Sequence, residues 1–128
     1  MLVCRDPAEA YRRAAFDLRV SGSDVHALTA LCFEEAIAAV NRACYAHVHG
    51  HTLLRGRAMT RARSALTALK AGVDITHPMG EPLLTIYDAA DAAIVHSMSH
   101  FDRDAMIRVS DDLQEIAGAL AQAARNMA

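Results

Sequence analysis

Histidines are the residues of this sequence whose spacing most resembles a chemical site. His47, His49 and His51 alternate with other residues in the run AHVHGH, and His96 and His100 stand four positions apart. Neutral imidazole is the commonest side-chain ligand for metal ions, and it suits zinc, copper and nickel. Each group is therefore a candidate metal site.

The run AHVHGH fits the end of a helix better than a metal site. Side chains at positions i and i+2 of a helix point about 200° apart, so His47 and His49 do not share a metal ion while the helix continues. Gly50 is a residue type that often ends helices, and positive charge near that end is favoured by the helix dipole. We interpret the run as a corner between two helices. Adventitious binding of nickel or zinc by a frayed helix end stays open.

The pair His96 and His100 has the spacing of two ligands on one helix face but lacks the glutamate of the H-E-x-x-H motif. Bundles with carboxylate-bridged metals need Glu-x-x-His pairs, and the chain has none. The acidic pairs at positions 34–35 and 88–91 have no histidine at that spacing. We predict two polar residues at an exposed helix end, with no metal and no cofactor.

The cysteines also predict no chemistry. Cys32 and Cys44 lie on one expected helix, about 18 Å apart along its axis, whereas a disulfide needs Cα atoms within about 7 Å. Cys4 stands alone near the N-terminus, and no C-x-x-C spacing is present. The sequence also has no glycine-rich phosphate loop and no nucleophile–base signature, so nothing in it predicts an enzyme.

Composition indicates a single helical domain. The 128 residues carry a formal charge of −2, 53% of them are hydrophobic, and only 5% are aromatic, with no tryptophan. Much of the apolar content is alanine, the strongest helix former, so we expect closely packed helices. No stretch approaches the roughly 20 apolar residues of a membrane span, and Arg5 and Asp6 interrupt any signal-peptide core. We expect a cytoplasmic protein.

Capping residues divide the chain into five helical segments. Asp6 and Pro7 begin a short segment that reaches about residue 19, and Ser23 or Asp24 caps the next helix. A third helix over about 54–71 ends at Gly72, a fourth has Pro82 in its first turn, and Asp102 caps the last. Short connections predict an all-α, antiparallel up-down-up-down four-helix bundle. The expected division is an N-terminal segment, 1–22, packed across a bundle, 23–128.

Apolar stripes at helical spacing predict the core. In the helix beginning near residue 23 the stripe contains Val25, Leu28, Leu31, Cys32, Ala36, Ile37, Val40 and Cys44. In the next helix it contains Ala58, Ala62, Ala65, Leu66 and Leu69. In the last two helices it contains Leu83, Ile86, Tyr87, Ala90, Ile94 and Met98, and then Met106, Val109, Leu113, Ile116, Leu120, Ala124 and Met127.

An arginine-rich run occupies the rest of the third helix. Arg55, Arg57, Arg61, Arg63 and Lys70 lie away from most of its apolar stripe. The run has no interleaved aromatic residues, and the chain is slightly acidic overall. We interpret it as a solvated helix face that binds acidic side chains; nucleic-acid binding is the alternative.

The order of several short motifs resembles the flagellar secretion chaperone family FliS over residues 9–121. The family's Leu-Tyr-Asp-Gly-Ala motif is matched within LTALCFEEAI, with Phe33 at the tyrosine position, Glu34 for aspartate and Glu35 for glycine. The family's later Leu-Tyr is matched in LLTIYDAADAAI by Ile86-Tyr87, and its N-terminal tyrosine in AYRRAAF by Tyr11. The usual Ser-Pro-Glu helix start is replaced by Ser23-Asp24-Val25-His26.

The resemblance implies a chaperone without enzymatic activity. It would bind the disordered C-terminal segment of new flagellin, prevent premature polymerisation and deliver flagellin to the type III export gate. The formal charge of −2 gives no sign of a nucleic-acid or membrane-surface protein, so we expect no nucleic-acid partner and no membrane insertion. The residues that we expect at the partner surface are Tyr11, Phe16, Leu18, Phe33, Tyr87, Ala89, Ala92 and Ala93. Core packing is the alternative role of Phe33 and Tyr87. Two other functions stay open: a metal-binding or redox helical bundle, and a small regulatory module that binds through its arginine helix.

Overall fold

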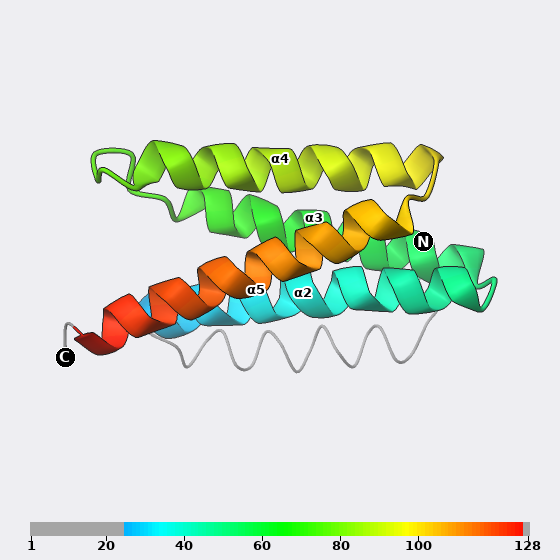
Figure 1. Cartoon of the computed structure of the whole chain (residues 1–128), viewed down its shortest axis with the longest axis horizontal. Coiled ribbons are helices and arrows are strands. Elements are labelled where there is room, and N and C mark those ends of the chain that lie inside the picture. The colour runs from blue at the N-terminus through cyan, green and yellow to red at the C-terminus, as the bar shows by residue number, and fades with distance from the viewer. Residues whose placement is uncertain (1–24, 127–128) are drawn as a thin grey trace, which may run out of the picture.

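Four helices occupy residues 25–126, which are the residues that the computed structural model describes. They are α2 (Val25–Val48), α3 (Thr52–Ala71), α4 (Gly80–Ser99) and α5 (Arg103–Asn126). Each helix runs back along the one before it (Figure 1). The expected all-helical fold is confirmed for this part of the chain, which contains no strand. The N-terminal segment expected over residues 1–22 lies outside the described residues.

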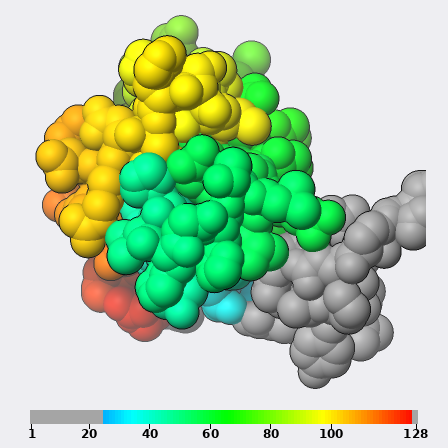
Figure 2. All heavy atoms as spheres, turned by 90° about the vertical axis from the view of Figure 1, so that its right-hand side faces the viewer, coloured from blue at the N-terminus to red at the C-terminus, as the bar shows by residue number. Residues whose placement is uncertain are grey.

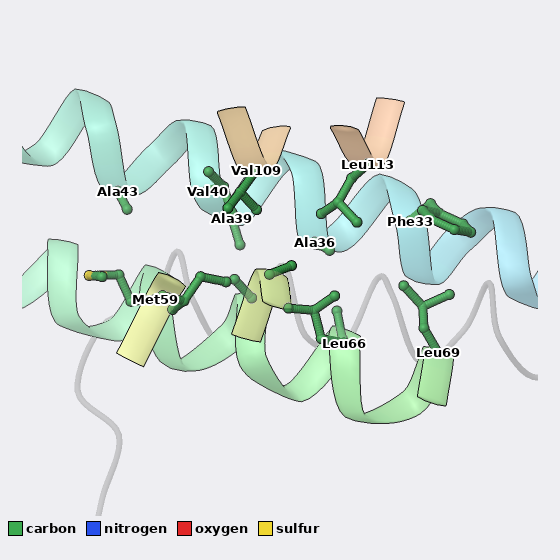
Figure 3. Close-up of a cluster of buried hydrophobic side chains, with 14 of the residues drawn as sticks. Phe33, Ala36, Ala39, Val40, Ala43, Met59, Leu66, Leu69, Val109 and Leu113 are labelled. Carbon is green, nitrogen blue, oxygen red and sulfur yellow. The ribbon is translucent and has the colours of Figure 1, made fainter. Parts of the chain in front are cut away.

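The α2–α3 pair forms the most closely packed part of the fold. The chain places buried alanines on both helices, including Ala39 and Ala43 of α2 and Ala62 of α3. Small side chains allow two helix axes to approach, and α2 packs more extensively against α3 than against α5. Figure 3 shows side chains of both helices pointing into one layer, with Val109 and Leu113 of α5 reaching it. This layer is the centre of the hydrophobic core.

Ion pairs supplement apolar packing between α3 and α4. Arg63 Nε donates to Asp91 Oδ1 at 2.8 Å and Arg63 Nη2 donates to Asp91 Oδ2 at 3.2 Å, which makes a bidentate pair. Lys70 Nζ lies 3.2 Å from Asp88 Oδ1. These contacts join a helix rich in arginine to a helix with three carboxylates and no lysine or arginine. The arginine-rich face therefore binds acidic side chains of its own chain.

The corner between α2 and α3 is closed by glycine geometry. Gly50 has a φ of 72°, in the left-handed region that favours glycine. Gly50 N–H donates to the His47 carbonyl at 3.2 Å, and His51 N–H donates to the Ala46 carbonyl at 2.8 Å. These two bonds are the Schellman pattern of a helix end. The prediction that AHVHGH marks a helix corner at Gly50 is confirmed.

Three further predicted helix boundaries are confirmed, whereas α3 begins at Thr52, two residues before its predicted start. Pro82 lies in the first turn of α4, and Asp102 Oδ1 accepts a hydrogen bond from Ala105 N–H at 3.0 Å at the start of α5. Helix α3 ends at Ala71, before Gly72. Gly72 has a φ of −90°, however, so this helix end does not use the left-handed conformation available to glycine.

The predicted apolar stripes are right at the centre of the bundle and wrong at its ends. All five predicted core residues of α3 are buried. In α4, Met98 is 42% exposed, and Ser97 is buried in its place and accepts a hydrogen bond from Asp102 N–H. Val25 and Leu28, at the start of α2, are 77% and 37% exposed.

The last turns of α5 are also covered only in part. Leu113 is the last fully buried residue of this helix, and Ile116, Leu120 and Ala124 are half-buried. Met127 lies outside the described residues. No helix within residues 25–126 is both long and apolar enough to cross a membrane.

Candidate partner-binding surface

The described residues line a large hollow that runs along α3, from the first turns of α2 at one end of the bundle to Thr52 and Leu53 beside the α2–α3 corner at the other. It follows the first turns of α2 and the exposed side of α3 and reaches the start of α4 and the end of α5. We call it the α2–α3 hollow. Its volume is about 2030 Å³, whereas small-molecule sites usually have about 300–1,000 Å³. A hollow of this size fits a polypeptide segment better than a metabolite.

The rim of the α2–α3 hollow is apolar and open to solvent. Large apolar side chains that line it are exposed by 77% at Val25, 37% at Leu28, 67% at Leu53 and 50% at Met79. Soluble proteins rarely gather exposed apolar side chains except at interaction sites. The first turn of α2, which was expected in the core, therefore belongs to this rim.

Phe33 and Tyr87 meet on the wall of the hollow, between α2 and α4. Their ring centroids are 5.9 Å apart at an interplanar angle of 60°, a tilted aromatic contact. Each side chain is only 2% exposed, and burial raises the pKa of Tyr87 to about 12. Both residues line the hollow and both belong to the core. The structure therefore joins two predicted site residues and also gives them the alternative role, core packing.

The other predicted site residues are not brought together with this aromatic pair. Ala89 and Ala92 are exposed and Ala93 is half-buried on α4, and none of the three lines the α2–α3 hollow. The predicted residues of the N-terminal segment lie outside the described residues: Tyr11, Phe16 and Leu18.

The same hollow is lined by a charged pair that was not predicted from the sequence. Arg61 Nε donates to Glu35 Oε2 at 2.5 Å, and Arg61 Nη2 lies 2.5 Å from the same oxygen. The side chains are 8% and 13% exposed, so the expectation that Arg61 belongs to a solvated face is wrong. A signal was available, because Arg61 falls at helical spacing between Ala58 and Ala65 in the apolar stripe.

His47 and His49 of the AHVHGH run make packing and hydrogen-bond contacts at one end of the bundle. His47 stacks on Phe101 with ring centroids 4.2 Å apart, and Arg55 Nη1 donates to His47 Nδ1 at 2.8 Å. His49 Nδ1–H donates to the Tyr45 carbonyl at 2.9 Å. Figure 2 faces this end, where the α2–α3 corner lies beside the turn between α4 and α5. These rings make structural contacts at a corner.

The candidate metal and thiol residues form no cluster in the part of the chain that is described. His96 and His100 are both exposed, with ring centroids 6.2 Å apart at the end of α4, as expected. Within residues 25–126 no group of three or more histidine, cysteine, aspartate or glutamate side chains is placed to hold a metal ion. Cys32 and Cys44 are free thiols, and burial raises the pKa of each.

Comparison with known proteins adds one finding. Residues 7–127 match the family model described as flagellar protein FliS. The match includes all four described helices and extends into the N-terminal residues that precede them. The chain matches no curated protein.

Proposed function

The chain belongs to the flagellar protein FliS family, and on that premise we propose that it is a cytosolic export chaperone for flagellin. Membership in the family implies a flagellar chaperone role. The proposed client is the disordered C-terminal segment of newly made flagellin. Binding would keep flagellin monomeric and assist its delivery to the type III export gate.

The single observation that carries this proposal is the α2–α3 hollow with its exposed apolar rim. A disordered segment that folds as an amphipathic helix buries its apolar face in such a groove. Coupled folding covers a large surface while the complex stays reversible, because the ordering of the segment costs free energy. A chaperone that must release its client before export needs both properties.

The predicted residues fit this proposal in different ways. Phe33 and Tyr87 shape the wall of the hollow. Tyr11, Phe16 and Leu18 are the proposed contact or gate residues of the N-terminal segment, on the strength of the family resemblance. Ala89, Ala92 and Ala93 would let a client helix approach α4 closely, because their side chains are small.

Residues 25–126 give less support to the two alternative functions, a metal-binding or redox bundle and a regulatory module that binds through its arginine helix. No described group of side chains carries the metal-binding alternative. The regulatory alternative depends on the arginine helix, where Arg61, Arg63 and Lys70 pair with carboxylates of the chain. A protein that binds DNA through this helix would show a steep loss of affinity with salt. We propose a chaperone without a nucleic-acid partner.

Calorimetry with the host's own flagellin tests the proposed function. Full-length flagellin and flagellin without its C-terminal segment would be titrated into the chaperone at micromolar concentrations. We expect a complex with the first and none with the second. A dissociation constant of about 1 μM corresponds to roughly −8.2 kcal/mol. No heat and no complex with full-length flagellin would contradict the proposal.

A further inference from the structure

A carboxylate and a guanidinium stand in the wall of an otherwise mostly apolar hollow. Glu35 of α2 and Arg61 of α3 both line it, and their ion pair is largely shielded from solvent at 13% and 8% exposure. Glu35 occupies the position at which the Leu-Tyr-Asp-Gly-Ala motif of the FliS family has glycine. The pair is therefore a feature in which this chain departs from that motif.

The geometry of the pair leaves one carboxylate oxygen with spare acceptor capacity. Both Nε and Nη2 of Arg61 converge on Oε2 of Glu35. Arg42 Nη2 makes a longer ion pair with Oε1 at 3.7 Å, which is beyond hydrogen-bond distance. A carboxylate has about four acceptor positions, two on each oxygen. Oε1 therefore keeps acceptor capacity beside the Arg42 ion pair, on a residue that lines the hollow.

The surroundings of Glu35 favour a hydrogen-bond donor over an apolar side chain at Oε1. Towards the start of α2 the wall becomes apolar, with Cys32 about one turn and Leu28 about two turns from Glu35, and with Ala65 on α3. A partner that covers the hollow removes water from Oε1. An apolar side chain at that point would leave a charged acceptor without a donor, and a donor side chain would gain a charge-assisted hydrogen bond.

We propose that Glu35, held in place by Arg61, is a specificity-determining residue of the α2–α3 hollow. It selects a client segment that carries a donor side chain (amide, hydroxyl or ammonium) next to apolar residues. It thereby fixes the register of the segment along the groove. This inference rests on the proposed function, because it assigns the chemistry of the client at the same site.

The test is a set of double-mutant cycles between chaperone and client. In the flagellin C-terminal segment, each Asn, Gln, Ser, Thr and Lys is replaced in turn by alanine, and its affinity is measured for three chaperones. These are the wild type, Glu35→Leu/Arg61→Leu, and the control Arg63→Leu/Asp91→Leu. The control removes an ion pair between α3 and α4 that does not line the hollow. Apolar replacement of both members of a buried pair is often neutral for stability, and melting temperatures verify the fold.

We expect one client substitution to weaken binding to the wild type and to the control about tenfold, because a buried charged acceptor loses its donor. The same substitution should have no effect with Glu35→Leu/Arg61→Leu. Should that variant fail to fold, Glu35→Gln replaces it, and the loss at that client position should shrink to a few-fold.

Two results overturn the inference. If the segment binds the wild type but no client position depends on residues 35 and 61, the inference fails and the proposed function stands. If the segment does not bind the wild type at all, the proposed function fails, and the inference fails with it.

Discussion

Tyr87 belongs to the core and to the wall of the α2–α3 hollow at the same time. Its ring packs against Phe33, and its position comes from the apolar stripe of α4. A side chain with both roles couples binding to stability, so a substitution here changes both and does not isolate either. Residues on the rim, such as Leu28, are the better probes of binding.

The raised pKa of Tyr87 predicts a loss of stability at alkaline pH. Burial raises this pKa from 10.0 to about 12, because the folded protein disfavours the phenolate. The folded state therefore holds the proton more tightly than the unfolded state. The part of the free energy of unfolding that depends on the protonated Tyr87 hydroxyl is fully present below pH 10. It is lost as the pH rises towards 12. In Tyr87→Phe this loss, up to about 3 kcal/mol in the wild type, should be absent.

Urea unfolding of the wild type and Tyr87→Phe at several pH values between neutral and alkaline measures this difference. As the pH rises, the wild type should lose free energy of unfolding relative to Tyr87→Phe, whatever the offset between the two at neutral pH. A constant offset across the whole range would show that the Tyr87 hydroxyl is as easily ionised as in the unfolded chain.

At the scale of helices, local chemistry determined the boundaries. Gly50, Pro82 and Asp102 act through backbone geometry and capping bonds that involve only neighbouring residues. Such signals can be read from the sequence. The central apolar stripes were also predictable, because any helix in a bundle must bury one face.

Features that depend on which helix lies beside which could not be predicted in the same way. The burial of Arg61 requires Glu35 on a neighbouring helix, 26 positions away in the sequence. The exposure of Leu28 and the half-burial of Leu120 depend on where the four helices stop overlapping. The α2–α3 hollow is lined in part by these ends and in part by α3 along its length. Its position therefore came only with the tertiary structure.

The start of α4 predicts opposite effects for two glycine substitutions. A Cβ atom at Gly80 would lie 2.4 Å from the Asp74 carbonyl oxygen and 2.9 Å from Ile75 Cα, both of which are backbone atoms. We expect Gly80→Ala to lower the free energy of unfolding by about 2 kcal/mol or more, because the loop and helix must move apart.

Gly118 supplies the matched control, because a Cβ atom there meets nothing within 4 Å and the residue lies inside α5. We expect Gly118→Ala to raise the free energy of unfolding by up to about 1 kcal/mol, since alanine favours the helix. Urea unfolding of both variants is the measurement. A change of the same sign in both would contradict the account of the α4 start.

As a whole molecule, the chain combines a tightly packed pair of helices with more loosely covered ends. The α2–α3 pair provides the rigid scaffold, and α4 is joined to it in part through ion pairs. The last turns of α5 and the first turn of α2 leave apolar side chains open. This division suits a chaperone, because a rigid core can present an apolar groove without unfolding.

Tyr11 provides a prediction at this scale, motivated by its match to the N-terminal tyrosine of the family. We expect Tyr11→Ala to change client affinity several-fold while the melting temperature moves by no more than about 2 °C. Calorimetry and thermal unfolding of the same preparations measure the two effects. A large fall in melting temperature with unchanged affinity would make Tyr11 a structural residue.

The most direct test of the central claim compares two equally exposed apolar residues. Leu28 and Ile107 are each 37% exposed, but only Leu28 lines the α2–α3 hollow. The flagellin C-terminal segment would be titrated calorimetrically into the wild type, Leu28→Gln and Ile107→Gln. Full burial of an exposed leucine side chain contributes about 1.5–3 kcal/mol, and Leu28 has about a third of its surface left to bury, so Leu28→Gln should bind roughly three- to sixfold more weakly. Ile107→Gln should bind like the wild type. Equal affinities for all three, or a loss only in Ile107→Gln, would contradict the assignment of the hollow as the client site.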